Sequence, residues 1–77
     1  MRLISRRLFE HHLSAHLDRI EPGLAALLRH KVGYAWRPMV DEMYQQRADD
    51  LNLANLTRVL TECARSLARL NDSLEDE

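Results

Sequence analysis

The sequence predicts an all-α protein, a small antiparallel bundle of three or four helices with the C-terminal helix as its spine. In the last third of the chain, apolar residues recur in alternating steps of three and four, which places them on one face of a packed helix. These residues are Leu53, Leu56, Leu60, Cys63, Leu67, Leu70 and Leu74. Two glycines and two prolines are too few for a turn-rich β protein. A chain of 77 residues allows one domain, residues 1–77.

The first predicted helix runs from about residue 2 to residue 20. On a helical wheel, its main apolar face is formed by Phe9, Leu13, His16, Leu17 and Ile20. Ile4, Leu8 and Ala15 lie on the opposite side, so we expect this helix to make contacts on two sides. Residues 21–23 end it, because the proline among them cannot continue a helix.

The second predicted helix opens at Pro22, and the third begins at Pro38, where the second ends or kinks. Met39 and Met43 belong to the apolar side of the third segment. Extending the leucine spacing backward would place acidic side chains on the core side, so the register must shift before the leucines begin. Residues 49–50 are both Asp, a favoured helix N-cap, and we predict the break there. A single kinked helix from Pro38 onward is the alternative.

The fourth predicted helix extends from about residue 51 to residue 74. The positions beside its leucine stripe carry no charge, whereas a self-sufficient parallel coiled coil usually has Glu or Lys there. We therefore expect this helix to be covered on more than one side. Because a domain this small buries only about 60% of its unfolded surface, we expect homodimerisation to complete the bundle. Acidic residues 75–77 oppose the helix dipole, which predicts a frayed tail.

Charge divides the chain into a basic and an acidic half. Residues 1–37 carry seven basic and three acidic side chains, a net charge of +4, and residues 38–77 carry four and nine, a net charge of −5. Self-complementarity between the two halves of a bundle explains this asymmetry, and it is the interpretation that we favour. A surface for a nucleic acid or an acidic partner is the other interpretation. Its candidate contacts are Arg2, Arg6, Arg7, Arg29 and Lys31.

Side chains of the kinds that ligate metals gather in the first helix. His12 and His16 are one turn apart, so both could reach one metal ion. A zinc site needs at least a third protein ligand, and none follows at motif spacing, so we predict no metal and no other cofactor. The single cysteine, Cys63, is expected to be a small buried hydrophobe. Without a catalytic motif, we expect the protein not to be an enzyme.

Protein binding is the function class that the pattern favours. The residues predicted for packing or interface contacts are Phe9, Leu13, His16, Leu17, Ile20, Met39, Met43, Leu53, Leu56, Leu60, Cys63, Leu67 and Leu70. We expect a small regulator or adaptor that masks or stabilises a partner protein, of the inhibitor, anti-activator or chaperone type, including those that phages or mobile elements encode. The same faces also fit the core of a helical homodimer. The alternative function is a dimeric nucleic-acid-binding regulator that uses the basic half.

The expected location is the cytoplasm. The longest uninterrupted apolar stretch, residues 24–28, is far too short to span a membrane, and no apolar segment of a secretory leader follows the basic N-terminus. A lone cysteine also fits a reducing compartment.

Overall fold

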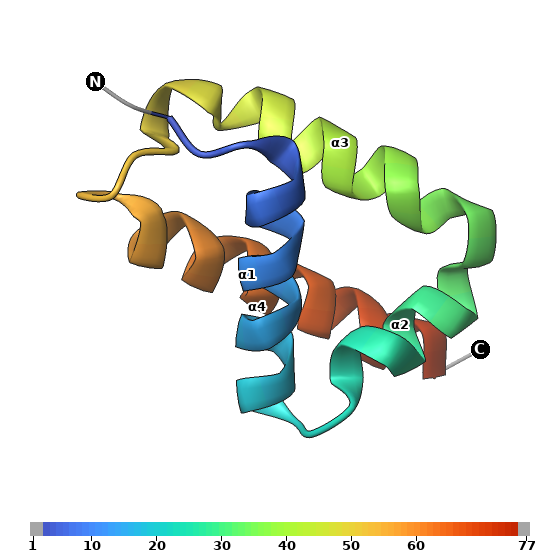
Figure 1. Cartoon of the computed structure of the whole chain (residues 1–77). Coiled ribbons are helices and arrows are strands. Elements are labelled where there is room, and N and C mark those ends of the chain that lie inside the picture. Colours follow the sequence, from blue (N-terminus) through green and yellow to red (C-terminus); the bar gives the residue numbers. More distant parts are fainter. Residues whose placement is uncertain (1–2, 76–77) are drawn as a thin grey trace.

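The computed structural model describes residues 3–75, and every regular element within them is a helix. The α-helices are α1 (Arg6–Ile20), α2 (Leu24–Val32), α3 (Trp36–Gln46) and α4 (Leu56–Glu75), with short 3-10 helices at Gly33–Ala35 and Ala48–Asp50. Figure 1 shows α1 crossing α4, and α1 also contacts α2 and α3. The predicted all-α class is confirmed.

The start of α1 is set by Ser5, whose side-chain oxygen accepts a hydrogen bond from the backbone N–H of Leu8 at 3.1 Å. A serine N-cap satisfies one of the donors that the first helical turn leaves unpaired. The helix therefore begins at Arg6, several residues after the predicted start at about residue 2.

The turn between α1 and α2 depends on Gly23, whose φ of +83° is a left-handed conformation that glycine adopts without strain. Pro22 lies within this turn instead of opening α2, which begins at Leu24. The Asp18 side chain accepts a hydrogen bond from the backbone N–H of Ala25 at 3.2 Å and so ties the two helices together.

The boundary between the second and third helical segments lies at Gly33 and not at Pro38, so that prediction is wrong. Gly33 has a φ of +57°, which ends α2, and α3 starts at Trp36. Pro38 is thus in the first turn of α3, where the backbone N–H that it lacks has no helical acceptor.

The helical path is interrupted between α3 and α4, with a 3-10 helix over the two aspartates. Asn52 then accepts hydrogen bonds on its side-chain oxygen from the backbone N–H groups of Ala54 at 3.0 Å and Asn55 at 3.3 Å. This is an Asx turn, a local alternative to helix. Consequently α4 begins at Leu56 and not near residue 51, and Leu53 precedes it.

The core is one cluster that draws on all four α-helices. Its buried apolar residues are Ile4, Phe9, Leu13, Leu17, Leu24, Ala25, Leu28, Trp36, Val40, Leu51, Val59, Leu60, Cys63, Ala64 and Leu67. Within α4, the buried face includes positions beside the leucine stripe as well as the stripe itself, so α4 is covered over a broad arc.

Among the described residues, no helix is both long and apolar enough to cross a membrane. Residues 76–77 of the expected frayed tail lie outside the described residues, and residue 75 is helical.

Candidate functional site

A hollow of about 890 Å³ lies between α1, α2 and α3, and we call it the arginine groove. Its lining residues are Arg6, Arg7, Glu10, His11, Ser14, Arg29, Trp36, Arg37 and Asp41. Counting His11 as neutral, four arginines and two carboxylates give these side chains a net charge of +2. The groove is therefore an electropositive surface on a chain whose net charge is −1.

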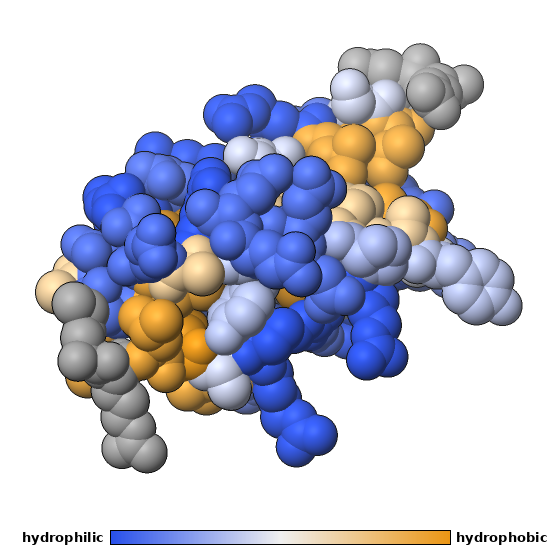
Figure 2. All heavy atoms as spheres, turned by 90° about the horizontal axis from the view of Figure 1, so that it is seen from above, coloured by the Kyte–Doolittle hydropathy of each residue, from blue (hydrophilic) through white to orange (hydrophobic). Residues whose placement is uncertain are grey.

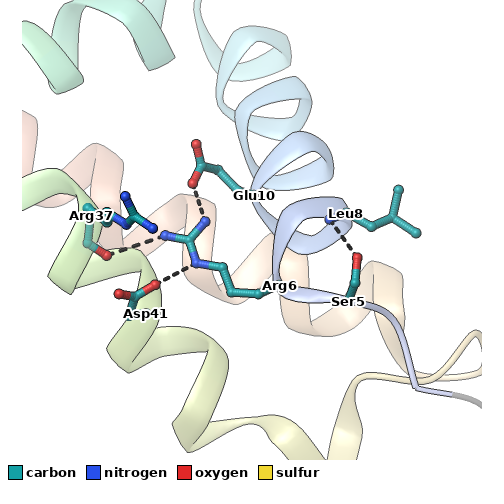
Figure 3. A network of polar contacts seen from close by, with 6 residues as sticks. All are labelled: Ser5, Arg6, Leu8, Glu10, Arg37 and Asp41. Atoms are coloured by element: carbon teal, nitrogen blue, oxygen red, sulfur yellow. Dashed lines mark hydrogen bonds and ion pairs between the residues drawn. The ribbon is translucent and has the colours of Figure 1, made fainter.

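Arg6 joins two walls of the groove (Figure 3). It donates hydrogen bonds to the Glu10 carboxylate, one turn away on α1, and to Asp41 Oδ1 on α3, with 2.5 Å from Arg6 Nε to that oxygen. It also reaches the backbone oxygen of Arg37 at 3.4 Å. Burial lowers the pKa of Arg6, but the two carboxylates outweigh burial and raise the pKa above its usual value. The ion pairs thus hold the first turn of α1 against α3.

The other three arginines of the groove keep their charge unneutralised. In the part of the chain that the structure describes, Arg7, Arg29 and Arg37 form no ion pair. The Arg29 guanidinium carbon lies 6.0 Å from the centroid of the Trp36 ring, at the outer limit of a cation–π contact. Figure 3 shows the Arg37 side chain directed toward Arg6. Three cations from three helices therefore face one hollow without an ion pair to any described residue.

Trp36 forms part of the groove wall and is only 7% exposed. Its indole Nε1 is buried and donates to no described atom. An unpaired buried donor costs roughly 1–3 kcal/mol. This unsatisfied donor therefore lies within the wall of the groove and is not open to the hollow.

The structure brings together three of the five cations predicted to bind an acidic partner or a nucleic acid: Arg6, Arg7 and Arg29. Lys31 is not part of this groove, and its Nζ donates to Asn71 Oδ1 of α4 at 3.0 Å. Arg2 lies outside the described residues. Arg37 was not among the predicted contacts, although its i,i+4 spacing to an aspartate, like that of Arg6 to Glu10, could have placed it on a charged helix face.

Three leucines are exposed in the segment before α1, in the first turn of α1 and in the turn before α4. Leu3, Leu8 and Leu53 are 49%, 42% and 84% exposed, and we call them the exposed leucines. Figure 2 shows two apolar areas separated by a broad hydrophilic surface, one toward each end of the chain. Leu53 was predicted to begin the packing stripe, but it projects from the turn before α4, and Leu51 occupies the core in its place.

Backbone hydrogen bonds fix the segments that carry Leu3 and Leu53. The Ile4 N–H donates to the backbone oxygen of Leu51 at 3.0 Å, and the Tyr44 hydroxyl donates to the backbone oxygen of Ile4 at 2.9 Å. The Tyr44 ring also packs against Phe9, with 5.7 Å between ring centroids. We call these contacts the Ile4 strap. They hold Leu3 and Leu53 next to buried residues while leaving both side chains exposed.

The remaining predicted packing residues lie at different depths. The buried ones are Phe9, Leu13, Leu17, Leu60, Cys63 and Leu67, and those partly buried against the core are Met39, Met43, Leu56 and Leu70. Ile20, the last residue of α1, is half-exposed. With His16, which is partly buried, Ile20 lines a smaller hollow of about 240 Å³ between α1 and α4.

One of the two candidate metal ligands, His16, contacts the backbone of the other. His16 Nδ1 lies 3.1 Å from the backbone oxygen of His12, and because that oxygen can only accept, Nδ1 carries the proton. This bond occupies Nδ1 and leaves Nε2 as the ring nitrogen of His16 that could ligate a metal. Within the described residues, no group of three His, Cys, Asp or Glu side chains is arranged to hold a metal ion.

Cys63 is almost fully buried in the core. Burial raises the pKa of its thiol above the ordinary value of 9.0, and the nearby Arg47 guanidinium only partly opposes that rise. A buried thiol with a raised pKa is a poor nucleophile, so Cys63 fills space instead of reacting.

Comparisons of the chain with protein-family models, with curated proteins and with solved structures find no match.

Proposed function

We propose that this protein is a non-enzymatic, cytoplasmic regulator or adaptor that binds another protein and masks or stabilises it, as inhibitors, anti-activators and chaperones do. The observation that supports the proposal is the set of exposed leucines beside the Ile4 strap. Contiguous apolar surface is typical of interaction sites, because apolar side chains gain free energy when a partner removes them from water.

The second apolar area suits self-association. Leu70 and Leu74 on α4 and Val32 on α2 pack against the core but remain partly exposed. Figure 2 shows an apolar area toward the side on which the C-terminus lies in Figure 1. We propose that two copies pair through these residues, which leaves the exposed leucines of each copy for the partner protein.

We do not extend the proposal to nucleic acid. A nucleic acid backbone is bound by cations that follow its path along a face or channel. Here Arg6, Arg7 and Arg29 converge on one groove, and Lys31 contacts Asn71 elsewhere.

Site-specific photo-crosslinking tests the partner surface. A benzophenone amino acid replaces Leu53 in one variant and Tyr34, a fully exposed aromatic residue, in a matched control. In extract of the source cells, we expect the Leu53 variant to yield one discrete adduct that is absent from the Tyr34 variant. Equal labelling at both positions, or no adduct at position 53, would contradict the proposed surface.

Sedimentation velocity at low micromolar concentration tests the dimer. We expect a particle of twice the 9.0 kDa chain mass, and we expect Leu70→Ser with Leu74→Ser to reduce it to the mass of one chain. The same serine changes at Leu8 and Leu53 serve as the control and should leave the mass unchanged. A wild-type particle with the mass of a single chain would refute the homodimer and leave the partner surface to be judged by crosslinking.

A further inference from the structure

We propose that the arginine groove binds a small polyanion that carries two or more phosphate groups. Its charge is the first reason. Arg7, Arg29 and Arg37 belong to α1, α2 and α3, and all three face one hollow without an ion pair to a described residue. Like charges that converge in this way repel one another, and an anion between them removes that repulsion.

Hydrogen-bonding capacity points in the same direction. The two carboxylates of the groove, Glu10 and Asp41, both accept from Arg6. The three remaining guanidinium groups of the groove, those of Arg7, Arg29 and Arg37, carry donors and no acceptor. Phosphate oxygens are strong acceptors, and the planar fork of a guanidinium matches two of them at once.

The groove has the dimensions of a small-molecule site. Its volume of about 890 Å³ falls in the range of roughly 300–1,000 Å³ that such sites occupy. A single inorganic phosphate would leave most of this space to water and engage few of the cations. A ligand with two or more linked phosphates, such as pyrophosphate or a nucleoside triphosphate, reaches cations on more than one helix.

The Arg6 ion pairs organise the groove before any ligand binds. Arg6 joins α1 to α3 through Glu10 and Asp41, which fixes the distance between two walls (Figure 3). Side chains that are already ordered lose less conformational entropy when they bind.

Fluorescence of Trp36, the single tryptophan, allows a direct test because this ring is part of the groove wall. The full-length protein is titrated with pyrophosphate at low salt, with calorimetry on the same samples. We expect saturable binding with a Kd below about 1 mM. We expect Arg37→Gln and Arg7→Gln each to weaken binding by about tenfold, as the loss of a charge-assisted hydrogen bond predicts.

The matched control is Arg69→Gln on α4, which makes the same change in net charge outside the groove. We expect its Kd to stay within about twofold of wild type, the range of a screened long-range charge effect. If Arg69→Gln weakens binding as much as Arg37→Gln, the interaction is non-specific attraction and the proposal is wrong. Absence of binding by both methods overturns it as well.

Two further titrations define the ligand class. Succinate has two negative charges but no phosphate, and equal affinity for it would replace the phosphate proposal with a dicarboxylate one. A single-stranded oligonucleotide that binds more tightly per phosphate than a nucleoside triphosphate would overturn the small-ligand proposal in favour of a nucleic acid. Preference for pyrophosphate or the nucleoside triphosphate supports it and also distinguishes a free polyphosphate from a nucleotide.

Discussion

Tyr44→Phe is the substitution that tests the Ile4 strap most directly. It deletes the hydroxyl that donates to the backbone oxygen of Ile4 at 2.9 Å and leaves the ring in place against Phe9. The backbone bond from Ile4 to Leu51 remains, but one of the two contacts that hold the segment before α1 is lost. The variant therefore isolates a single hydrogen bond that spans residues distant in sequence.

The expected cost follows from the kind of bond that is lost. A neutral hydrogen bond contributes about 0.5–1.5 kcal/mol to the net stability of a protein. The bond is partly buried, so water can reach the freed carbonyl only in part, and we expect a loss of about 1 kcal/mol. A domain of this size has a total stability of roughly 4–12 kcal/mol, so the loss is a substantial part of it. For 60–100 residues, a loss of about 1 kcal/mol lowers Tm by about 4–8 °C.

Urea unfolding followed by far-ultraviolet circular dichroism measures this change. Tyr34→Phe is the matched control, because the Tyr34 side chain is fully exposed and forms no hydrogen bond with a described residue. We expect the control to unfold within about 0.3 kcal/mol of wild type, as surface substitutions do. If Tyr44→Phe does the same, the hydrogen bond from the Tyr44 hydroxyl to Ile4 contributes nothing to the stability of the fold. A drop in crosslinking yield at Leu53 in Tyr44→Phe would connect the strap to the partner surface.

Three further substitutions test other parts of the fold. Leu67→Asp buries a charge without a partner, so we expect loss of the cooperative thermal transition by circular dichroism; a folded variant would refute the placement of α4. Asn52→Ala removes the acceptor for Ala54 and Asn55, and we expect urea unfolding to show a loss of about 1–2 kcal/mol. Burial raises the pKa of the Cys63 thiol in the folded protein above 9.0, the ordinary value that applies in the unfolded chain. The folded protein therefore holds the thiol proton more tightly, which stabilises it at pH values below 9.0. This contribution to stability is lost as pH rises through the folded pKa. The stability advantage of wild type over Cys63→Ala should therefore be smaller at pH 10 than at pH 8, and a constant difference would contradict a buried thiol.

Apolar periodicity in the sequence predicted the helical class because it records directly which side of each segment is buried. Leu60, Cys63 and Leu67 lie in the core with the spacing of one helical face. The boundaries between helices depend on backbone φ angles and local hydrogen bonds, and apolar periodicity does not record these. Pro38 was predicted to separate two helices, yet a first-turn proline is compatible with helix, and the positive φ of Gly33 makes the separation.

The candidate sites depend more on tertiary structure. Arg6, Arg7 and Arg29 are scattered through the first half of the sequence, and only the packing of α1, α2 and α3 brings them to one groove. Leu53 fits the leucine spacing, but the Asx turn at Asn52 removes it from the helix and exposes it. A local side-chain hydrogen bond thus overrides the periodic pattern and creates part of the exposed apolar surface.

The two proposed surfaces share the first turn of α1, and this arrangement follows from helical geometry. Residues two positions apart point about 200° from one another on a helix, so Arg6 and Leu8 project to opposite sides (Figure 3). Arg6 faces α3 and the groove, while Leu8 faces solvent beside the segment that the Ile4 strap holds. A ligand that neutralises the groove would stabilise this turn, and a partner protein that binds Leu8 needs the same turn to be ordered. If both proposals hold, each ligand should raise the affinity of the protein for the other, because binding free energies coupled through one structural element are reciprocal.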